Sequence, residues 1–127
     1  STSTYNSNQM AYFSNYGSNN VDIFAPGYQI YSSVPDKSKS ETKGKFKYLN
    51  GTSMAAPNVT GVAAVLRSFY PRIPAKDIKD IIIKSGVKMF REIQISGKEY
   101  KIDSENLSVS GSVVNLYNAL IEASSYK

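Results

Sequence analysis

A serine within a run of small residues is the feature of this sequence best suited to chemistry. Residues 51–57 are Gly-Thr-Ser-Met-Ala-Ala-Pro, and apolar residues with helical spacing follow directly. A helix N-terminus gathers unpaired backbone N–H groups and the positive end of the helix dipole, so negative charge is favoured there. A serine at this junction can attack a carbonyl carbon while its own N–H stabilises the resulting oxyanion. The pattern therefore predicts acyl transfer at Ser53.

The residues around Ser53 fit a sharp turn into a helix. Gly51 allows the backbone to turn tightly, and Pro57, which lacks an N–H, belongs in a first helical turn. The alternative interpretation is that Thr52 or Ser53 only caps the helix, the commonest role of a hydroxyl at such a place. The complete seven-residue string favours the catalytic interpretation.

The elements that must position this junction follow from the hydrophobic spacing. Short strands are expected around residues 10–13, 21–24 and 30–34, with a brief extended segment at 46–49. Helices are expected from about Ser53 to Tyr70, between Pro74 and Gly86, and from about Asn115 to Ser124. A β-hairpin with a two-residue turn at Ser96-Gly97 is expected between Arg91 and Ile102.

Each expected helix has an apolar face. In the first helix, which we expect to be buried, this face comprises Val59, Val62, Ala63, Leu66, Phe69 and Tyr70, and Gly61 and Ala64 suit close packing. In the second helix the inward residues are Ile78, Ile81 and Ile82. In the last helix they are Leu116, Ala119, Leu120 and Ala123.

The string around Ser53 resembles the nucleophile motif of subtilisin-like serine proteases, the subtilases of peptidase family S8. Segments 10–17, 21–27, 30–34 and 113–120 are also similar to segments of that family. The resemblance implies that residues 1–127 form the C-terminal portion of one α/β catalytic domain. Its sheet would be doubly wound and mostly parallel, with helices on both faces.

The resemblance also implies roles for individual residues in a serine endopeptidase that hydrolyses peptides or proteins. Ser53 would form the acyl-enzyme and donate one N–H to the oxyanion, and Thr52 would support that oxyanion hole. Asn50 and Gly51 would lie close to the substrate, although Asn50 is equally well explained as a turn-former. Met54 would lie beside Ser53, where its thioether is open to oxidation, or it only packs.

The sequence contains no histidine, whereas a Ser-His-Asp triad needs an imidazole to accept and return the serine proton. In subtilisin the histidine precedes the serine by roughly 150 residues, whereas 52 residues precede Ser53 here. We therefore expect a partner, the missing N-terminal part of the same catalytic domain, on the same or a separate chain. The alternative is a non-catalytic, subtilase-like remnant that binds peptides or serves as a scaffold.

Composition excludes several other classes. The net charge is +5, but five of the fifteen basic residues lie between Lys37 and Lys47, in a polar stretch expected to be a solvated loop. Nucleic-acid binding is not expected, because no recognisable module interleaves basic and aromatic residues. A lipase or esterase is not expected either, because the Gly-x-Ser-x-Gly frame is missing around Ser53.

Cofactors and location are less constrained by the residues. The sequence has no cysteine, so neither a disulfide framework nor a zinc site is indicated. No cofactor or metal is assigned, and a structural calcium ion is left open for the complete domain. No apolar run approaches the roughly 18 residues of a membrane span. The family resemblance implies a secreted, periplasmic or cell-surface protein of bacterial type.

Overall fold

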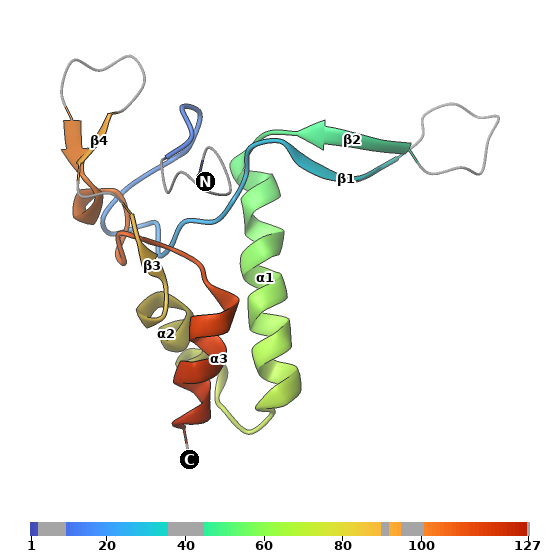
Figure 1. Ribbon diagram of the computed structural model, residues 1–127, viewed down its shortest axis with the longest axis vertical. Helices are drawn as coiled ribbons and strands as arrows, with labels where there is room; N and C mark the ends of the chain where they lie inside the picture. Colours follow the sequence, from blue (N-terminus) through green and yellow to red (C-terminus); the bar gives the residue numbers. More distant parts are fainter. Residues whose placement is uncertain (3–9, 36–44, 90–91, 95–100, 127) are drawn as a thin grey trace.

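The computed structural model of the protein describes residues 1–2, 10–35, 45–89, 92–94 and 101–126. Its helices pack beside one another in the lower part of Figure 1. They are α1 (Thr52–Phe69), α2 (Ala75–Lys84) and α3 (Leu116–Ser124). These bounds confirm the helices predicted from the sequence.

The strands pair in antiparallel two-stranded sheets: β1 with β2, β3 with β6, and β4 with β5. Their bounds are β1 (Ile30–Val34), β2 (Lys45–Leu49), β3 (Val87–Lys88), β4 (Glu92–Gln94), β5 (Lys101–Asp103) and β6 (Ser112–Val113), and a 3₁₀ helix covers Ser104–Asn106. The β1–β2 hairpin projects as an arm from the N-terminal end of α1 (Figure 1). β4 and β5 confirm that a hairpin forms here, and the predicted turn at Ser96-Gly97 lies outside the described residues. The predicted register is wrong, because a two-residue turn there would pair Gln94 with Glu99, whereas Gln94 pairs with Lys101.

Local sequence signals explain where the helices begin and end. α1 stops at Phe69 because Tyr70 precedes Pro71, and a residue before proline is disfavoured in the helical region. α3 begins after Asn115, whose side chain accepts a hydrogen bond from the Asn118 backbone N–H at 2.9 Å. This side-chain cap satisfies one of the free N–H groups in the first turn.

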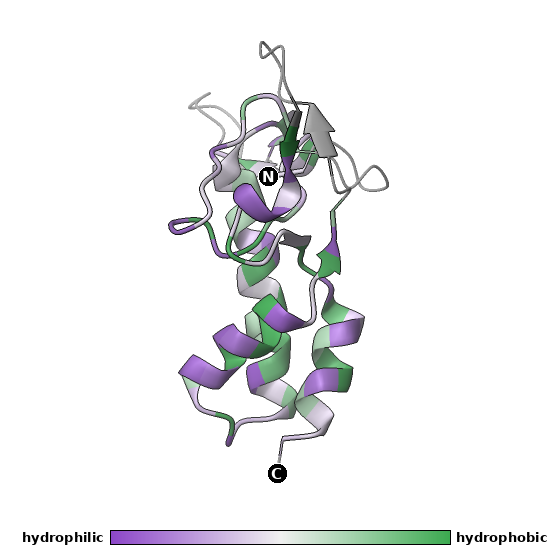
Figure 2. Cartoon of the chain, turned by 90° about the vertical axis from the view of Figure 1, so that its left-hand side faces the viewer, coloured by the Kyte–Doolittle hydropathy of each residue, from purple (hydrophilic) through white to green (hydrophobic). Residues whose placement is uncertain are grey.

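Two apolar clusters form the core. The larger cluster lies among the helices and comprises Val62, Leu66, Ile73, Ile78, Ile81, Ile82, Ala119 and Ala123. The smaller cluster lies among the short strands and comprises Met10, Phe24, Met89 and Leu107. Along the helices, purple and green alternate in Figure 2, as expected for helices that bury one face and expose the other.

The prediction of a strand at 10–13 is wrong except for its first residue, Met10. Met10 forms an antiparallel bridge with Thr2. The chain then turns, and the Ser14 N–H donates to the Ala11 carbonyl at 2.9 Å. A strand needs a neighbouring backbone beside each of its residues, and in the described part of the chain only Ser1 and Thr2 pair with this segment, through the Met10 bridge and the Ala11 N–H bond to the Ser1 carbonyl at 2.9 Å.

The strand predicted at 21–24 is reduced to a single bridge residue. Isolated parallel bridges join Phe24 to Val113 and Thr2 to Pro26. The parallel part of the structure is therefore narrow in the residues described. The alternating sequence favoured extended backbone, but it could not show how many neighbouring strands this chain supplies.

The prediction that α1 is buried holds for one face only. Val62 and Leu66 are buried, whereas the side chain of Phe69 is 72% exposed. A Cβ added at Gly61 would meet no atom within 4 Å, so the close packing predicted there is absent from the described residues. In α3, Ala119 and Ala123 are buried as predicted, but Leu116 is 39% exposed.

No helix in the described ranges is both long enough and apolar enough to cross a membrane.

Candidate active site

Ser53 is the second residue of α1, and it is exposed at the N-terminal end of the helix. Gly51 occupies the N-cap, and no side chain forms a capping hydrogen bond. The interpretation of Thr52 or Ser53 as an N-cap is therefore wrong. Within the part of the chain that the structure describes, the Ser53 hydroxyl has no hydrogen-bond partner, so it is open to an incoming group.

Gly51 makes the sharp entry into α1. Its backbone has φ 154° and ψ 161°, a region that glycine alone adopts readily. A Cβ added there would lie 3.4 Å from the Sδ atom of Met54. Glycine at this position thus lets the chain pass from the end of β2 at Leu49 to the nucleophile with three intervening residues.

The first turn of α1 is prepared for negative charge. The Met54 N–H donates to the Gly51 carbonyl at 3.1 Å, whereas the N–H groups of Thr52 and Ser53 have no acceptor among the described residues. The turn contains no acidic side chain that would offset the positive end of the helix dipole. An oxyanion beside Ser53 would therefore meet free donors and a favourable potential.

Pro57 lies in the second turn of α1, not in the first as the sequence suggested. Because proline has no N–H, the Ser53 carbonyl lacks the usual donor from position 57. The Asn58 side-chain amide donates to the Met54 carbonyl at 3.2 Å and to the Pro26 carbonyl at 3.0 Å. The Asn58 side chain thus ties this turn of α1 to Pro26, while the bond missing at the Ser53 carbonyl is not replaced by it.

Two more hydrogen bonds hold residues 50–53, which we call the nucleophile loop, against segment 26–29. The Gly51 N–H donates to the Gly27 carbonyl at 2.9 Å, and the Gln29 N–H donates to Asn50 Oδ1 at 2.7 Å. A Cβ on Gly27 would lie 2.7 Å from the Gly51 carbonyl oxygen, so the two backbones approach too closely for any larger residue. Gln29 itself has a positive φ of 54°.

The sequence therefore located Asn50 correctly at a supporting turn, but it did not single out Gly27, Gln29 or Asn58. The Pro-Gly pair at 26–27 marked only the end of a strand. The contacts of these residues with the loop arise from tertiary structure, because more than 20 positions separate Gln29 from Asn50.

Thr52 and Met54 flank the nucleophile on α1, and both are half-buried. Thr52 lines a small cavity of about 280 Å³ that extends under the first turn to Ala25 and Val59. All the residues predicted near the substrate, 50–54, thus lie together in one continuous turn.

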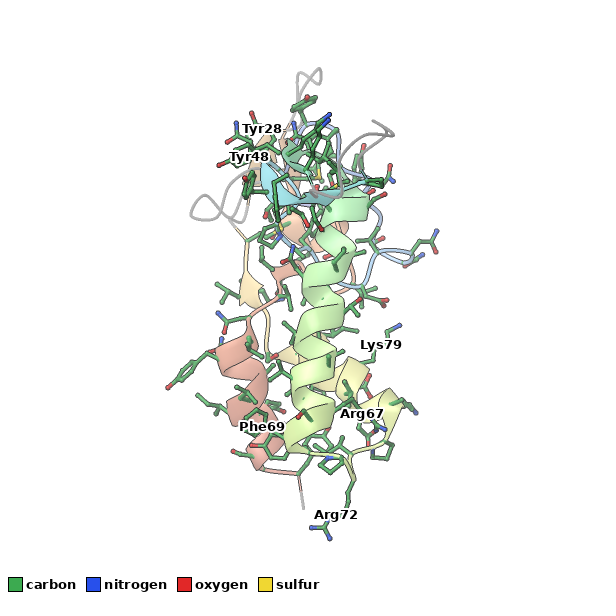
Figure 3. The ribbon with its side chains drawn as sticks, turned by 90° about the vertical axis from the view of Figure 1, so that its right-hand side faces the viewer. Tyr28, Tyr48, Arg67, Phe69, Arg72 and Lys79 are labelled. Atoms are coloured by element: carbon green, nitrogen blue, oxygen red, sulfur yellow. The ribbon has the colours of Figure 1, made fainter. Side chains whose placement is uncertain are left out.

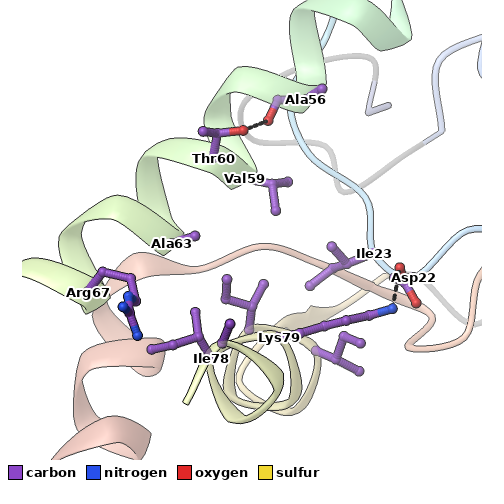
Figure 4. Close-up of a pocket in the computed structure, with 12 residues that line it drawn as sticks. Asp22, Ile23, Ala56, Val59, Thr60, Ala63, Arg67, Ile78 and Lys79 are labelled. Atoms are coloured by element: carbon purple, nitrogen blue, oxygen red, sulfur yellow. Dashed lines mark hydrogen bonds and ion pairs between the residues drawn. The ribbon is translucent and has the colours of Figure 1, made fainter. Parts of the chain in front are cut away.

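A larger groove of about 680 Å³ runs between α1 and α2 (Figure 4). Its lining is mostly apolar and includes Val59, Ala63 and Ile78, with Arg67 at one end. At the other end Lys79 forms an ion pair with Asp22, at 3.0 Å between Nζ and Oδ2. Ser53 does not line this groove.

Among the described residues, no three His, Cys, Asp or Glu side chains gather in a way that could hold a metal ion. The expectation that the protein uses no cofactor stays a prediction.

Comparison with known proteins identifies the family of this chain. The model of the Subtilase family matches residues 1–111. The chain belongs to the subtilase family. The chain of this subtilase is 37% identical over 108 residues to Subtilisin-like protease 2 of Plasmodium falciparum, covering 80% of the chain and 7% of that protein.

Solved structures confirm the α/β fold of this subtilase. A protease from Pseudoalteromonas arctica matches with a TM-score of 0.69 and 28% identity, covering 96% of this chain and 34% of that one. Fervidolysin from Fervidobacterium pennivorans, a keratinolytic enzyme related to subtilisin, matches with a TM-score of 0.61 and 28% identity. Coverage is 83% of this chain and 16% of fervidolysin, so the chain spans a minor part of both.

Replacing Gly51 with alanine should distort the nucleophile loop. The backbone conformation at this position costs a non-glycine residue about 1 to 3 kcal/mol, so we expect a loss of stability of this size. Denaturant unfolding measures it. Gly17→Ala is the control, because a Cβ there would meet no atom within 4 Å and should change stability far less. Equal stability of the two variants would contradict the conclusion that the backbone conformation at position 51 requires glycine.

Proposed function

We propose that this chain carries the nucleophile of a serine endopeptidase that hydrolyses peptide bonds through an acyl-enzyme on Ser53. The observation that supports this most is the exposed, uncapped hydroxyl of Ser53 at the start of α1. Membership of the subtilase family supports the same reaction class. The proposal includes a larger catalytic domain, of which this chain is the C-terminal portion.

In this proposal the Ser53 Oγ attacks the carbonyl carbon of the scissile peptide bond while a base removes its proton. The C=O electrons move to oxygen, and the backbone N–H of Ser53 stabilises that oxyanion. The proton then passes to the leaving amine as the C–N bond breaks. Water attacks the remaining ester in the same way and releases the acid, which restores Ser53.

The residues next to Ser53 have supporting roles in this reaction. Thr52, whose own N–H is free at the first position of α1, reinforces the oxyanion hole. Asn50 holds the loop by accepting the Gln29 N–H, and Gly51 keeps side-chain atoms away from the approaching peptide. Met54 lies beside this glycine, where oxidation to the sulfoxide would crowd the leaving-group side.

The base is proposed to be an imidazole on the N-terminal part of the catalytic domain. The chain itself contains no histidine. The uncovered face of α1 supports a partner of this kind, because Gly61 is exposed with open space above it. Glycine within a helix costs about 1 kcal/mol relative to alanine, and close packing by another segment would offset that cost.

Labelling with a fluorophosphonate tests the proposal directly. In the complete protein, we expect stoichiometric modification of Ser53, identified by peptide mass spectrometry, because the reagent reacts with activated serines. Ser68→Ala, which removes an exposed hydroxyl near the other end of α1, is the control and should label normally. Absence of labelling in the complete protein would instead favour a non-catalytic subtilase-like remnant.

The packing of the N-terminal part against α1 can be tested at Gly61. In a complete enzyme inactivated by Ser53→Ala to prevent autolysis, Gly61→Leu should lower stability by about 1 to 3 kcal/mol through overpacking. Denaturant unfolding gives the change, and Ser124→Leu, at an exposed position of α3, is the control. If the face is open in the complete protein, Gly61→Leu will stabilise the helix instead, by up to about 1 kcal/mol.

The proposed site of action is outside the cytoplasm, in a secreted or cell-surface enzyme, with polypeptides as substrates. The family resemblance supports this, and the lack of cysteine is compatible with it.

A further inference from the structure

The β1–β2 arm carries a group of aromatic side chains on one face. Tyr31 pairs directly with Tyr48, and Phe46 lies one residue pair further along the same face. The ring centroids of Tyr31 and Tyr48 are 4.8 Å apart, and those of Tyr31 and Phe46 are 5.6 Å apart. We call these three side chains the aromatic face of the arm.

The aromatic face is open although its rings touch one another. Tyr31 is 60% exposed, Phe46 58% and Tyr48 69%. A hairpin of two strands is at best marginally stable in water, and contiguous exposed apolar side chains mark interaction surfaces. Two of the three rings are tyrosines, which suit a surface that is exposed to water in the free protein and covered when a partner binds.

The arm is joined to the nucleophile loop at its base. β2 ends at Leu49, and the turn that contains Ser53 follows after Asn50. The hydrogen bond from the Gln29 N–H to Asn50 Oδ1 ties the start of β1 to the same turn. Figure 3 places Tyr48 and Tyr28 at the N-terminal end of α1, opposite the end that carries Phe69.

The length of the arm defines what it can reach. A strand of five residues extends about 15 Å, since each residue adds about 3.3 Å. Tyr48 and Phe46 lie within this length, five and seven positions before Ser53. A peptide held at Ser53 would therefore reach the aromatic face with residues up to about seven positions from the scissile bond.

The charge of the arm indicates which sequences it would favour. β2 alternates Lys45, Phe46, Lys47 and Tyr48, so the lysines lie on the face of the arm opposite the rings. Neither β1 nor β2 contains an acidic residue. Acidic residues of a bound peptide would thus complement the arm.

We propose that the aromatic face is an auxiliary binding site for the protein substrate. It takes an extended stretch with aromatic or apolar side chains and neighbouring acidic residues, up to about seven positions from the bond that Ser53 attacks. The inference rests on the proposed function, because the occupant is the substrate of that site.

The test compares two substrates in the complete protease. One is a short peptide anilide, and the other is a peptide that extends eight residues on both sides of the scissile bond and contains Phe and Asp. In the variant Tyr31→Ser/Phe46→Ser/Tyr48→Ser, we expect kcat/KM for the long peptide to fall about tenfold, mainly through KM, because stacked aromatic contacts are lost. The short substrate should be cleaved at the original rate.

Tyr117→Ser is the matched control, because Tyr117 is 72% exposed on α3, away from the arm. This variant should cleave both substrates normally. An equal loss on both substrates in the triple variant would mean that the aromatic face packs inside the enzyme, and this would overturn the proposal. Unchanged cleavage of the long peptide would overturn it as well.

A binding measurement distinguishes failure of this inference from failure of the proposed function. In the Ser53→Ala background, fluorescence anisotropy of the labelled long peptide should show about tenfold weaker binding after the triple substitution. If the complete protein hydrolyses neither substrate, the proposed function fails, but the binding comparison still decides whether the arm holds the peptide.

Discussion

Ser53→Ala in the complete protease is expected to lower kcat by roughly 10⁶-fold, the size known from subtilisin itself, while the protein stays folded. The loss is large because nucleophile, base and carboxylate act as a unit, so removal of one disables the others. The side chain of Ser53 is exposed and makes no hydrogen bond within the described residues, so its loss should leave packing intact.

Hydrolysis of a peptide anilide at saturating substrate measures this change, and circular dichroism with denaturant unfolding checks the fold. Ser68→Ala on the same helix is the control and should retain full activity. Turnover by the Ser53→Ala variant within about tenfold of the unchanged enzyme would exclude Ser53 as the nucleophile. Loss of a true nucleophile lowers kcat by far more than that.

The second large effect concerns the 127-residue chain by itself. We expect it to show no peptidase activity above background and no labelling by fluorophosphonate. Without histidine the chain cannot supply the imidazole that takes the serine proton at neutral pH. A free serine hydroxyl is a weak nucleophile, even beside a favourable helix terminus.

Addition of the separately produced N-terminal part of the domain should restore both labelling and hydrolysis. The same part with its base histidine changed to alanine should bind without restoring either signal. Robust cleavage by the 127-residue chain alone would contradict the triad mechanism, because no imidazole would then be needed.

The site and the proposed partner surface lie on different parts of α1. The nucleophile is at the first turn, whereas Gly61 and the groove toward α2 lie further along the helix. The catalytic turn and the packing of α1 can therefore be disturbed independently. Gly51→Ala addresses the turn, and Gly61→Leu addresses the uncovered face.

The sequence by itself determined the local features of the site. The string from Gly51 to Pro57 predicted a turn into a helix with a reactive serine, since glycine, small residues and proline have strong local conformational effects. The apolar spacing predicted the three helices, the inward isoleucines of α2 and the buried alanines of α3. The alternation at 30–34 and 46–49 likewise predicted β1 and β2.

Only the tertiary structure decided which neighbours these elements have. The strand predicted at 10–13 became a turn, and Phe69 and Leu116 are exposed, because hydrophobic periodicity does not show what lies against each face. The bonds from Gln29 to Asn50 and from Asn58 to Pro26 join distant segments and leave no local signal. The chemistry of Ser53 is thus encoded locally, whereas its support depends on long-range contacts.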